Sequence, residues 1–357
     1  MKALKDSGHD VSVAVLKKGN EERYDVVESH LIGSGPLSEK TGKIWGRCFG
    51  GEMRKKFLYI WRMPRLTKLS AYICEKRPDV IFVRGQQNMF TLCSLLIARL
   101  SCHRVYLFAL LNKHSAESAI KQSALFFLRK VLGVSGIVTP LPNIKKSSDP
   151  FFYYVPFAVE PGKGNRALDK HEHVRIIAVG KMQRRKDHLL LLRAMKRLKE
   201  RHNIRLTIVG MRFDDEYQGE VFGFIRDNRL DDIVDVIMNI PNQELLTLYG
   251  NYDLFVLPSF NEPAGFVVLE AMAAGLPLIV SDTCGLKGYI EKQKNGAIFI
   301  SRNEDSLVNV IEAVIKNPRK LKDMGSHSRR LVQEKYLPHC FISNLNDLLK
   351  EQHSDRT

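Results

Sequence analysis

The feature that most constrains the fold is a regular alternation, from residue 171 onward, of short β-branched runs with longer amphipathic stretches. Five runs have the length and composition of buried strands, namely residues 174–180, 204–209, 233–238, 253–257 and 277–280. The stretches between them carry apolar residues at helical spacing, in residues 187–201, 217–229, 242–250 and 266–274. This pattern predicts an α/β domain built on a parallel sheet.

The first half of the chain repeats the pattern with four candidate strands, residues 11–16, 79–83, 105–110 and 136–139. A segment rich in Pro, Gly and charge, residues 157–172, interrupts the pattern and is typical of a domain boundary. We therefore predict two Rossmann-like, doubly wound domains that face each other across a cleft, residues 1–160 and 161–338. The remaining residues, 339–357, are predicted to form a helix that packs back on the first domain.

The composition adds three constraints. A chain of 357 residues, 44% of them hydrophobic, can bury two separate cores. Its six cysteines are scattered without a C-x-x-C pair, which argues against a zinc site or a disulfide framework. The sequence contains neither a run of about 18 apolar residues nor a signal peptide, so we expect a cytoplasmic location.

Positive charge is concentrated in the first half of the chain. Residues 1–168 hold 27 Lys and Arg against 13 Asp and Glu, a net charge of +14, whereas the rest holds 28 against 26. This excess predicts an anionic partner: nucleic acid, an acidic glycan or a phospholipid surface. Residues 54–69 interleave six Lys and Arg with aromatic and aliphatic residues. Such a segment either lies in an anionic membrane interface or packs on the domain with its cations in water. No nucleic-acid-binding module accompanies it, so nucleic acid is not the expected partner.

Residues 258–275 follow a candidate strand directly and therefore lie at the carboxyl end of the sheet, where α/β folds bind ligands. Pro263 and Gly265 break the chain into a tight loop before a helix that begins near Phe266. We expect the amides of Ala264, Gly265 and Phe266 to point out of the helix N-terminus, where they favour phosphate or sugar oxygens.

Two glutamates accompany this loop, Glu262 within it and Glu270 one helical turn beyond Phe266. A carboxylate among Val, Leu, Ala and Met is costly to bury unless it accepts hydrogen bonds, and a ribose diol would supply two donors to Glu270. Glu262 is placed to accept from hydroxyls of a bound sugar. The alternative is an ordinary amphipathic helix with Glu270 at its solvent edge. Because one loop and helix carry both glutamates, we interpret them as hydroxyl acceptors rather than as a glycosidase acid/base pair.

The stretch LYGNYDLFVLPSFNEPAGFVVLEAMAAGLPLIVSD, residues 248–282, resembles the family 4 retaining glycosyltransferases of the GT-B fold. The signature of that family is a Glu, seven residues and a second Glu, which Glu262 and Glu270 match. The segment VGKMQRRKDHLLLLRAM, residues 179–195, is similar to a second element of the family. The resemblance implies a GT-B architecture with an acceptor-side first domain and a nucleotide-sugar-binding second domain.

By position, the resemblance implies that Lys181 and Lys186 bind the donor diphosphate and that Glu262 and Lys186 are catalytic. Fixed positive charge and amide donors would let a diphosphate depart without a metal, and the chain contains no Asp-x-Asp. We therefore expect neither a metal nor a cofactor, with the nucleotide sugar as substrate. Taken alone, residues 181–186 would be a solvated basic loop, but they stand between a strand and a helix. His114 matches a cleft histidine that the family carries near the sugar.

This sequence departs from the family at four points. Lys181 replaces an Arg, which keeps the charge but loses the bidentate fork. Gly210-Met211-Arg212 stands where Gly-x-Gly is common, and CGLKG, residues 284–288, stands where Gly-Gly-x-x-Glu is usual. Residues 2–8 have the pattern of a helix end, so we expect the first domain to lack its first strand and the Gly-rich loop after it.

We therefore predict an enzyme that moves a sugar from a nucleotide diphosphate donor to a glycan or lipid-linked acceptor with retention. Bacterial lipopolysaccharide, capsule or exopolysaccharide synthesis is the expected setting. The enzyme would work in the cytoplasm, peripherally at the inner face of the plasma membrane if residues 54–69 bind there. Two alternatives stay open. One is a nucleotide-sugar epimerase or hydrolase of the same fold, and the other is a truncated chain that binds nucleotide or membrane without turnover.

Overall fold

The computed structural model describes residues 2–15, 29–31, 65–84, 89–102, 104–110, 132–142, 151–162 and 173–354. The chain divides into two compact units. Unit 1 comprises Met1–Val155 together with Ile342–Thr357, and unit 2 comprises Pro156–Phe341. We expected the corresponding boundaries at residues 160 and 338.

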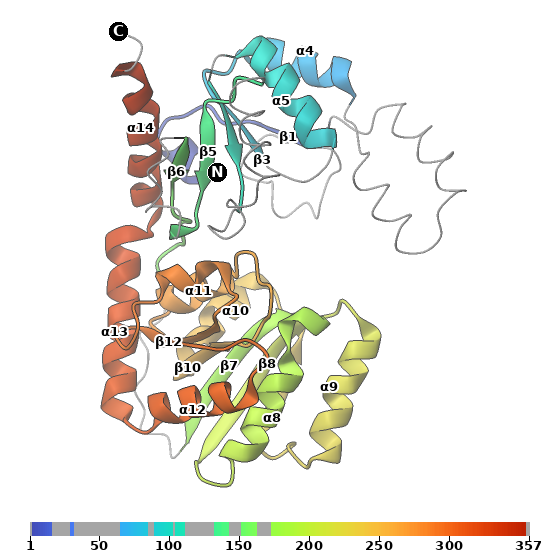
Figure 1. Cartoon of the computed structure of the whole chain (residues 1–357), viewed down its shortest axis with the longest axis vertical. Coiled ribbons are helices and arrows are strands. Elements are labelled where there is room, and N and C mark those ends of the chain that lie inside the picture. Colours follow the sequence, from blue (N-terminus) through green and yellow to red (C-terminus); the bar gives the residue numbers. More distant parts are fainter. Residues whose placement is uncertain are drawn as a thin grey trace, which may run out of the picture. The chain divides into compact units, whose positions relative to one another are not determined.

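Unit 2 contains a six-stranded parallel sheet in the order β12-β11-β10-β7-β8-β9 (Figure 1). The chain enters at the middle of the sheet, builds outward to β9, and returns to build the other half from β10. This is the strand order of a Rossmann-like, doubly wound sheet. The strands are β7 (Val174–Lys181), β8 (Ile204–Met211), β9 (Val234–Met238), β10 (Leu254–Leu257), β11 (Leu278–Ser281) and β12 (Gly296–Phe299).

The first five of these strands confirm the sequence prediction, and β12 was missed. Its sequence, GAIF, is four residues long and begins with two residues of low strand propensity. What makes it a strand is its partner, because Leu278 to Ser281 pair with it in register at the edge of the sheet.

The helices of unit 2 cover both faces of this sheet. Apolar faces of α8 (His188–Leu198), α9 (Asp215–Asp227) and α12 (Glu304–Ile315) form one continuous core with alternate strand residues such as Val256. Its neighbour Phe255 points to the other face, where its ring meets Tyr249 at the end of α10 (Asn242–Leu248). Two further helices, α11 (Val267–Ala273) and α13 (Pro318–Lys335), pack on each other.

Unit 1 contains a four-stranded parallel sheet in the order β3-β4-β5-β6 and a parallel pair, β1 and β2. The candidate strands of the first half are confirmed, whereas β2 and β6 were not predicted. Helices α4 and α5 pack on each other and share one apolar core with this sheet. The elements are α1 (Lys2–Asp6), β1 (Val13–Val15), β2 (Ser29–Leu31), α4 (Leu66–Lys76), β3 (Ile81–Arg84), α5 (Met89–Ser101), β4 (Val105–Phe108), β5 (Gly136–Thr139) and β6 (Phe152–Tyr154).

The last helix, α14 (Pro338–Ser354), begins in unit 2 and ends in unit 1. It contains the helical stretch expected near the C-terminus. Among the helices that the structure describes, none is long and apolar enough to cross a membrane. The described residues also contain no group of three or more His, Cys, Asp or Glu arranged to hold a metal ion.

Candidate functional site

The candidate site lies at the carboxyl ends of β7 and β10, where two loops meet. The loop after β7 forms a short 3-10 helix, Arg184–Lys186, before α8 begins. The loop after β10 runs from Pro258 to Phe266. The backbone N–H of Phe260 donates to the carbonyl of Arg185 over 2.9 Å, so the two loops are held side by side.

Glu262 is the buried centre of charge in this site. Its side chain is 7% exposed, and its Oε2 accepts hydrogen bonds from Nη1 of Arg185 at 2.7 Å and Nζ of Lys186 at 2.5 Å. Burial by itself would raise the pKa of the Glu262 carboxyl, but the charges and hydrogen bonds of Lys186 and Arg185 outweigh it and lower the pKa. The carboxylate therefore stays ionised because two cations share it.

Lys186 is buried as well, with 10% of its side chain exposed, because its aliphatic stem lies over Gly180 at the end of β7. A Cβ at Gly180 would lie 3.1 Å from Cδ of Lys186, so the glycine leaves room for the stem. The next residue, Asp187, turns the chain into α8 with a left-handed φ of 51°. Together these features place the ammonium group at the edge of the sheet.

The shape of the loop after β10 depends on a close backbone approach. Asn261 and Gly265 both take left-handed conformations, with φ of 51° and 72°. The N–H of Gly285 donates to the carbonyl of Glu262 over 2.8 Å. A Cβ at Gly285 would lie 2.0 Å from the carbonyl oxygen of Pro263, so only glycine fits at this position.

Helix α11 begins at Val267, with Phe266 as its N-cap residue. The carbonyls of Gly265 and Phe266 accept hydrogen bonds from the first turn of this helix. Within the part of the chain that the structure describes, no hydrogen bond is recorded from the amides of Ala264, Gly265 and Phe266. Their predicted contact with phosphate or sugar oxygens stays a prediction.

Glu270 is buried inside α11, with 9% of the residue exposed. The hydroxyl of Tyr249 donates to Oε2 of Glu270 at 3.1 Å. Burial raises the pKa of the Glu270 carboxyl, and the hydrogen bond from Tyr249 offsets part of that effect. The alternative that placed Glu270 at the solvent edge of an amphipathic helix is therefore wrong.

Two further cations, Lys181 at the end of β7 and Arg184 in the loop after it, do not meet Glu262. Lys181 is exposed, and its Nζ lies 4.9 Å from the ring centroid of Phe213. Arg184 instead pairs with Glu220 of α9, with Nη1 2.9 Å from Oε2. The structure therefore separates the basic loop into two cations at the site, Lys186 and Arg185, and two outside its buried centre.

Three residues of the site were not predicted individually: Arg185, Tyr249 and Gly285. Arg185 stood in the basic loop and Tyr249 in the stretch that carries the family resemblance, but sequence spacing gave no sign of their partners. Gly285 belongs to CGLKG, which we interpreted as a departure from the family. In the structure this glycine provides the room that the loop after β10 needs.

Two predictions of the sequence analysis concern residues that the structure does not describe. His114, the predicted sugar contact, lies outside the described residues, as do residues 54–64 of the basic segment 54–69. Both stay predictions. The described end of that segment, Arg65 to Leu69, enters helix α4.

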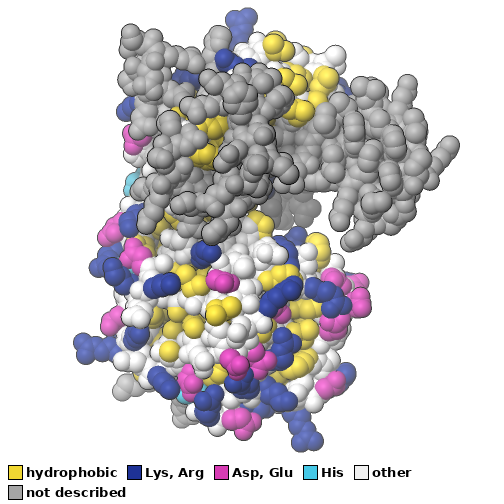
Figure 2. Space-filling view, viewed as in Figure 1, with side chains coloured by type: hydrophobic (Ala, Val, Ile, Leu, Met, Phe, Trp, Pro, Cys, Tyr) yellow, Lys and Arg dark blue, Asp and Glu magenta, His cyan; other side chains and the backbone are white. Residues whose placement is uncertain are grey.

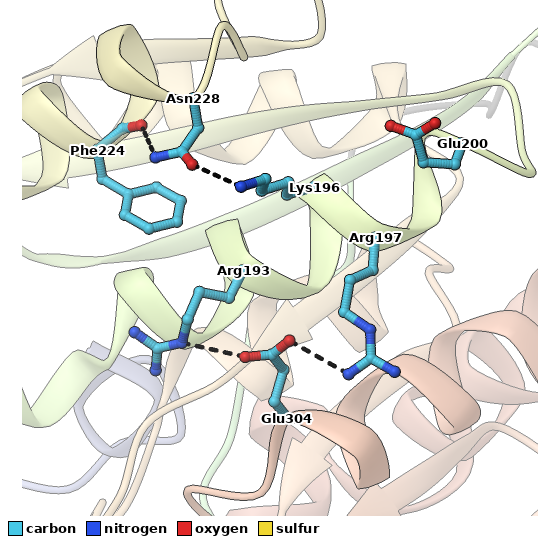
Figure 3. Close-up of a pocket in the computed structure, with 7 residues that line it drawn as sticks. All are labelled: Arg193, Lys196, Arg197, Glu200, Phe224, Asn228 and Glu304. Carbon is cyan, nitrogen blue, oxygen red and sulfur yellow. Dashed lines mark hydrogen bonds and ion pairs between the residues drawn. The ribbon is translucent and has the colours of Figure 1, made fainter.

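A pocket of about 470 Å³ lies away from this site, between α8, α9 and α12 (Figure 3). Its cations come from the second half of α8, whereas the candidate site precedes the first residue of that helix. Arg193 and Arg197 both pair with Glu304, and Lys196 donates to the side chain of Asn228 over 2.8 Å. The partners of these cations are part of the same surface, which is typical of solvent-exposed ion pairs that join helices.

Comparison with known proteins relates the second half of the chain to glycosyltransferases. Residues 165–331 match the family described as "Glycosyl transferases group 1". An uncharacterized glycosyltransferase of Methanocaldococcus jannaschii is 33% identical over 165 residues, which cover 45% of this chain and 40% of the relative. A D-inositol 3-phosphate glycosyltransferase of Pseudarthrobacter chlorophenolicus is 28% identical over 153 residues, with 42% and 36% covered.

A third relative is an amylovoran biosynthesis glycosyltransferase of Erwinia amylovora, 23% identical over 201 residues, with 54% of this chain and 49% of the relative covered. The matched region thus spans less than half the length of these relatives. Among solved structures, Anabaena HepE in complex with UDP and glucose superposes with a TM-score of 0.72 at 12% identity. The superposition covers 98% of this chain and 94% of HepE. This similarity confirms the GT-B fold.

The contact at Gly285 predicts that its replacement disturbs the loop that carries Glu262. We expect Gly285→Ala to destabilise unit 2 by about 1–3 kcal/mol, because its Cβ must displace backbone rather than a flexible side chain. Gly219→Ala in α9 is the matched control, since a Cβ there meets nothing within 4 Å and should stabilise the helix. The measurement is urea unfolding followed by circular dichroism. Equal effects of the two substitutions would contradict the prediction.

The lowered pKa of Glu262 predicts an acid-sensitive contribution to stability. A group whose folded pKa is lowered contributes stability above its unfolded pKa, about 4.3, and loses it as the pH falls through the folded pKa. We expect the wild type to be more stable than Glu262→Gln near pH 6 and the difference to shrink as the pH falls toward about 3. Urea unfolding across this range measures it, with Glu244→Gln on the exposed side of α10 as control. A difference that stays constant with pH would refute the prediction.

Proposed function

We propose that this chain transfers a sugar from a nucleotide diphosphate donor to a glycan or lipid-linked acceptor, because residues 165–331 match the family described as "Glycosyl transferases group 1". The observation that carries the proposal is the cluster of buried Glu262 and Lys186 with half-buried Arg185 at the carboxyl ends of two neighbouring strands. Cations and the backbone amides at the start of α11 suit phosphates, and the carboxylates beside them suit hydroxyls. The site therefore suits a ligand that has both.

In this proposal Lys186 and Arg185 neutralise the diphosphate. Both cations pair with Glu262 in the structure. A diphosphate offers them more acceptor oxygens and more charge than one carboxylate, so it takes over these contacts. Glu262 is then released to accept hydrogen bonds from hydroxyls of the transferred sugar. Lys181, exposed at the end of β7, adds a further positive charge near the phosphates.

The remaining contacts come from α11 and the loop before it. The amides of Ala264, Gly265 and Phe266 supply fixed donors to phosphate or sugar oxygens at the start of the helix. Glu270, one turn later, accepts hydrogen bonds from the ribose hydroxyls of the donor. Its burial suits this role, because a desolvated carboxylate binds hydroxyl donors more strongly than one in water.

In the reaction, the bond between the anomeric carbon and the departing phosphate oxygen breaks, and the acceptor oxygen bonds to that carbon on the same face. The acceptor proton passes to the departing phosphate oxygen, and the configuration is retained. Glu262 and Lys186 are the catalytic residues, since they contact the sugar and the leaving group. Charge neutralisation by fixed cations and amides replaces a metal ion in this scheme.

The acceptor that we propose is a bacterial surface glycan or its lipid-linked precursor, in lipopolysaccharide, capsule or exopolysaccharide synthesis. The relative from Erwinia amylovora, named for amylovoran biosynthesis, supports a polysaccharide, and the relative named for D-inositol 3-phosphate supports a smaller acceptor. The net charge of +14 in residues 1–168 favours an anionic acceptor in either case.

Titration calorimetry with UDP, GDP and ADP, with and without a chelator, tests the donor site. We expect one nucleotide to bind without added metal and Lys186→Ala to weaken it about tenfold or more, because a hydrogen bond to a charged group contributes about 1.5–3 kcal/mol. Arg184→Ala is the matched control, since Arg184 lies in the same turn but pairs with Glu220. It should bind as the wild type does.

Two results would contradict the proposal. The first is that no nucleotide binds the wild-type chain, and the second is that the two variants lose affinity equally. A nucleotide sugar incubated without acceptor provides a further control. Rapid release of free sugar would favour the hydrolase alternative, and conversion of one nucleotide sugar into its epimer would favour the epimerase.

We further propose that unit 1 works at an anionic membrane surface on the cytoplasmic side, through residues 54–69. Two observations support this. Leu66 on α4 and Leu100 on α5 are 43% and 88% exposed, so unit 1 offers aliphatic side chains at its surface as well as cations. The surface of unit 2 in Figure 2 mixes basic and acidic side chains. Residues 169–357 hold 28 Lys and Arg against 26 Asp and Glu, so the excess positive charge belongs to the first half.

Sedimentation with phosphatidylcholine vesicles, with and without phosphatidylglycerol, checks the membrane proposal. We expect binding only to the anionic vesicles, a loss of binding as salt rises, and a marked loss when Arg54, Lys55 and Lys56 become Ser. The matched control replaces three exposed cations of unit 2, Lys316, Arg319 and Lys322. Equal loss in both triple variants, or binding that salt does not change, would count against the proposal.

A further inference from the structure

Tyr249 and Glu270 are in contact, although one precedes strand β10 and the other follows it. Tyr249 begins the turn Tyr249–Asn251 just before β10, and Glu270 lies in α11 just after it. A hydrogen bond joins their side chains on one face of the sheet, where Phe255 of β10 packs edge-on against the Tyr249 ring with centroids 6.2 Å apart. Tyr249 is fully buried, so its hydroxyl must find its partner inside the protein.

The only partner recorded for that hydroxyl among the described residues is the carboxylate of Glu270, with 3.1 Å between the oxygens. Burial, followed by the charge and hydrogen bond of Glu270, raises the pKa of the Tyr249 phenol well above its ordinary value. The phenol therefore stays protonated and acts as donor. A phenol has one proton, so it occupies Oε2 of Glu270 alone.

The other carboxylate oxygen of Glu270 remains available to a ligand. No hydrogen bond to Oε1 is recorded from any described residue, and this atom is not among the fully enclosed polar atoms that lack a partner. A glutamate on a helix has three rotatable bonds, and a hydrogen bond at one oxygen fixes the direction of the other. The Tyr249 hydroxyl thus determines where Oε1 points.

We propose that Tyr249 is a positioning residue that orients Glu270 so that its Oε1 accepts from the ribose hydroxyls of the donor nucleotide. This inference rests on the proposed function. It makes Tyr249 a determinant of the preference for ribose, although Tyr249 itself touches no part of the nucleotide. Loss of the hydroxyl leaves the carboxylate buried but free to rotate, so the ribose hydroxyls lose an aligned acceptor.

The test compares uridine and guanosine diphosphates with their 2′,3′-dideoxy counterparts by titration calorimetry on the full chain. We expect the wild type to prefer the ribose form by about tenfold or more and Tyr249→Phe to reduce this ratio to about threefold or less. Tyr252→Phe is the matched control, because that tyrosine is also buried but its hydroxyl bonds to Thr207. It should keep the wild-type ratio.

The ratio separates a positioning role from a structural one. If Tyr249→Phe weakened both forms equally, the role would be structural and the inference would be overturned. Glu270→Gln provides a second variant that keeps the side-chain volume, and an unchanged ratio there would overturn the inference as well. Equal binding of both forms by the wild type would overturn this inference while the nucleotide site stood. Binding of neither form would overturn the proposed function and the inference together.

Discussion

The candidate site depends on the ion pair between Lys186 and Glu262. The Glu262 side chain is 7% exposed, and burial alone would raise the pKa of its carboxyl. The charges and hydrogen bonds of Lys186 and Arg185 lower that pKa instead, so the carboxylate keeps its charge because cations face it. The pair also fixes the backbone, since it joins the loop after β7 to the loop after β10. Removing one partner would leave the other charged and desolvated, which is far more costly than the pair is stabilising.

The surroundings shift the pKa values of the two glutamates of the site in opposite directions. Two cations lower the pKa of Glu262, whereas burial raises that of Glu270, where a neutral phenol is the partner. This difference agrees with the separate roles that we propose for them. A carboxylate held by cations can exchange those cations for a diphosphate, and a carboxylate held by one phenol can accept further hydrogen bonds from hydroxyls.

Much of this arrangement was predictable because it depends on local patterns. The strands of unit 2 from β7 to β11 are apolar runs bounded by turn residues. Glu262, Gly265 and Glu270 could be named from the loop and helix that follow a strand, and Lys186 from the family resemblance. The strands that were missed, β2, β6 and β12, have three or four residues each. Runs this short carry no period of their own, and only pairing with a neighbouring strand makes them part of a sheet.

The sequence by itself determined the α/β fold, the order of its elements and the position of Glu262 and Glu270 after a strand. Only the tertiary structure decided which residues meet. Lys186 and Glu262 are 76 positions apart, and they meet because β7 and β10 are neighbours in the sheet. Four cations stand within residues 181–186, yet two of them reach Glu262 and one turns to Glu220. That choice depends on the turn at Asp187 and on the room left by Gly180 and Gly285, which are properties of packed backbone rather than of spacing along the chain.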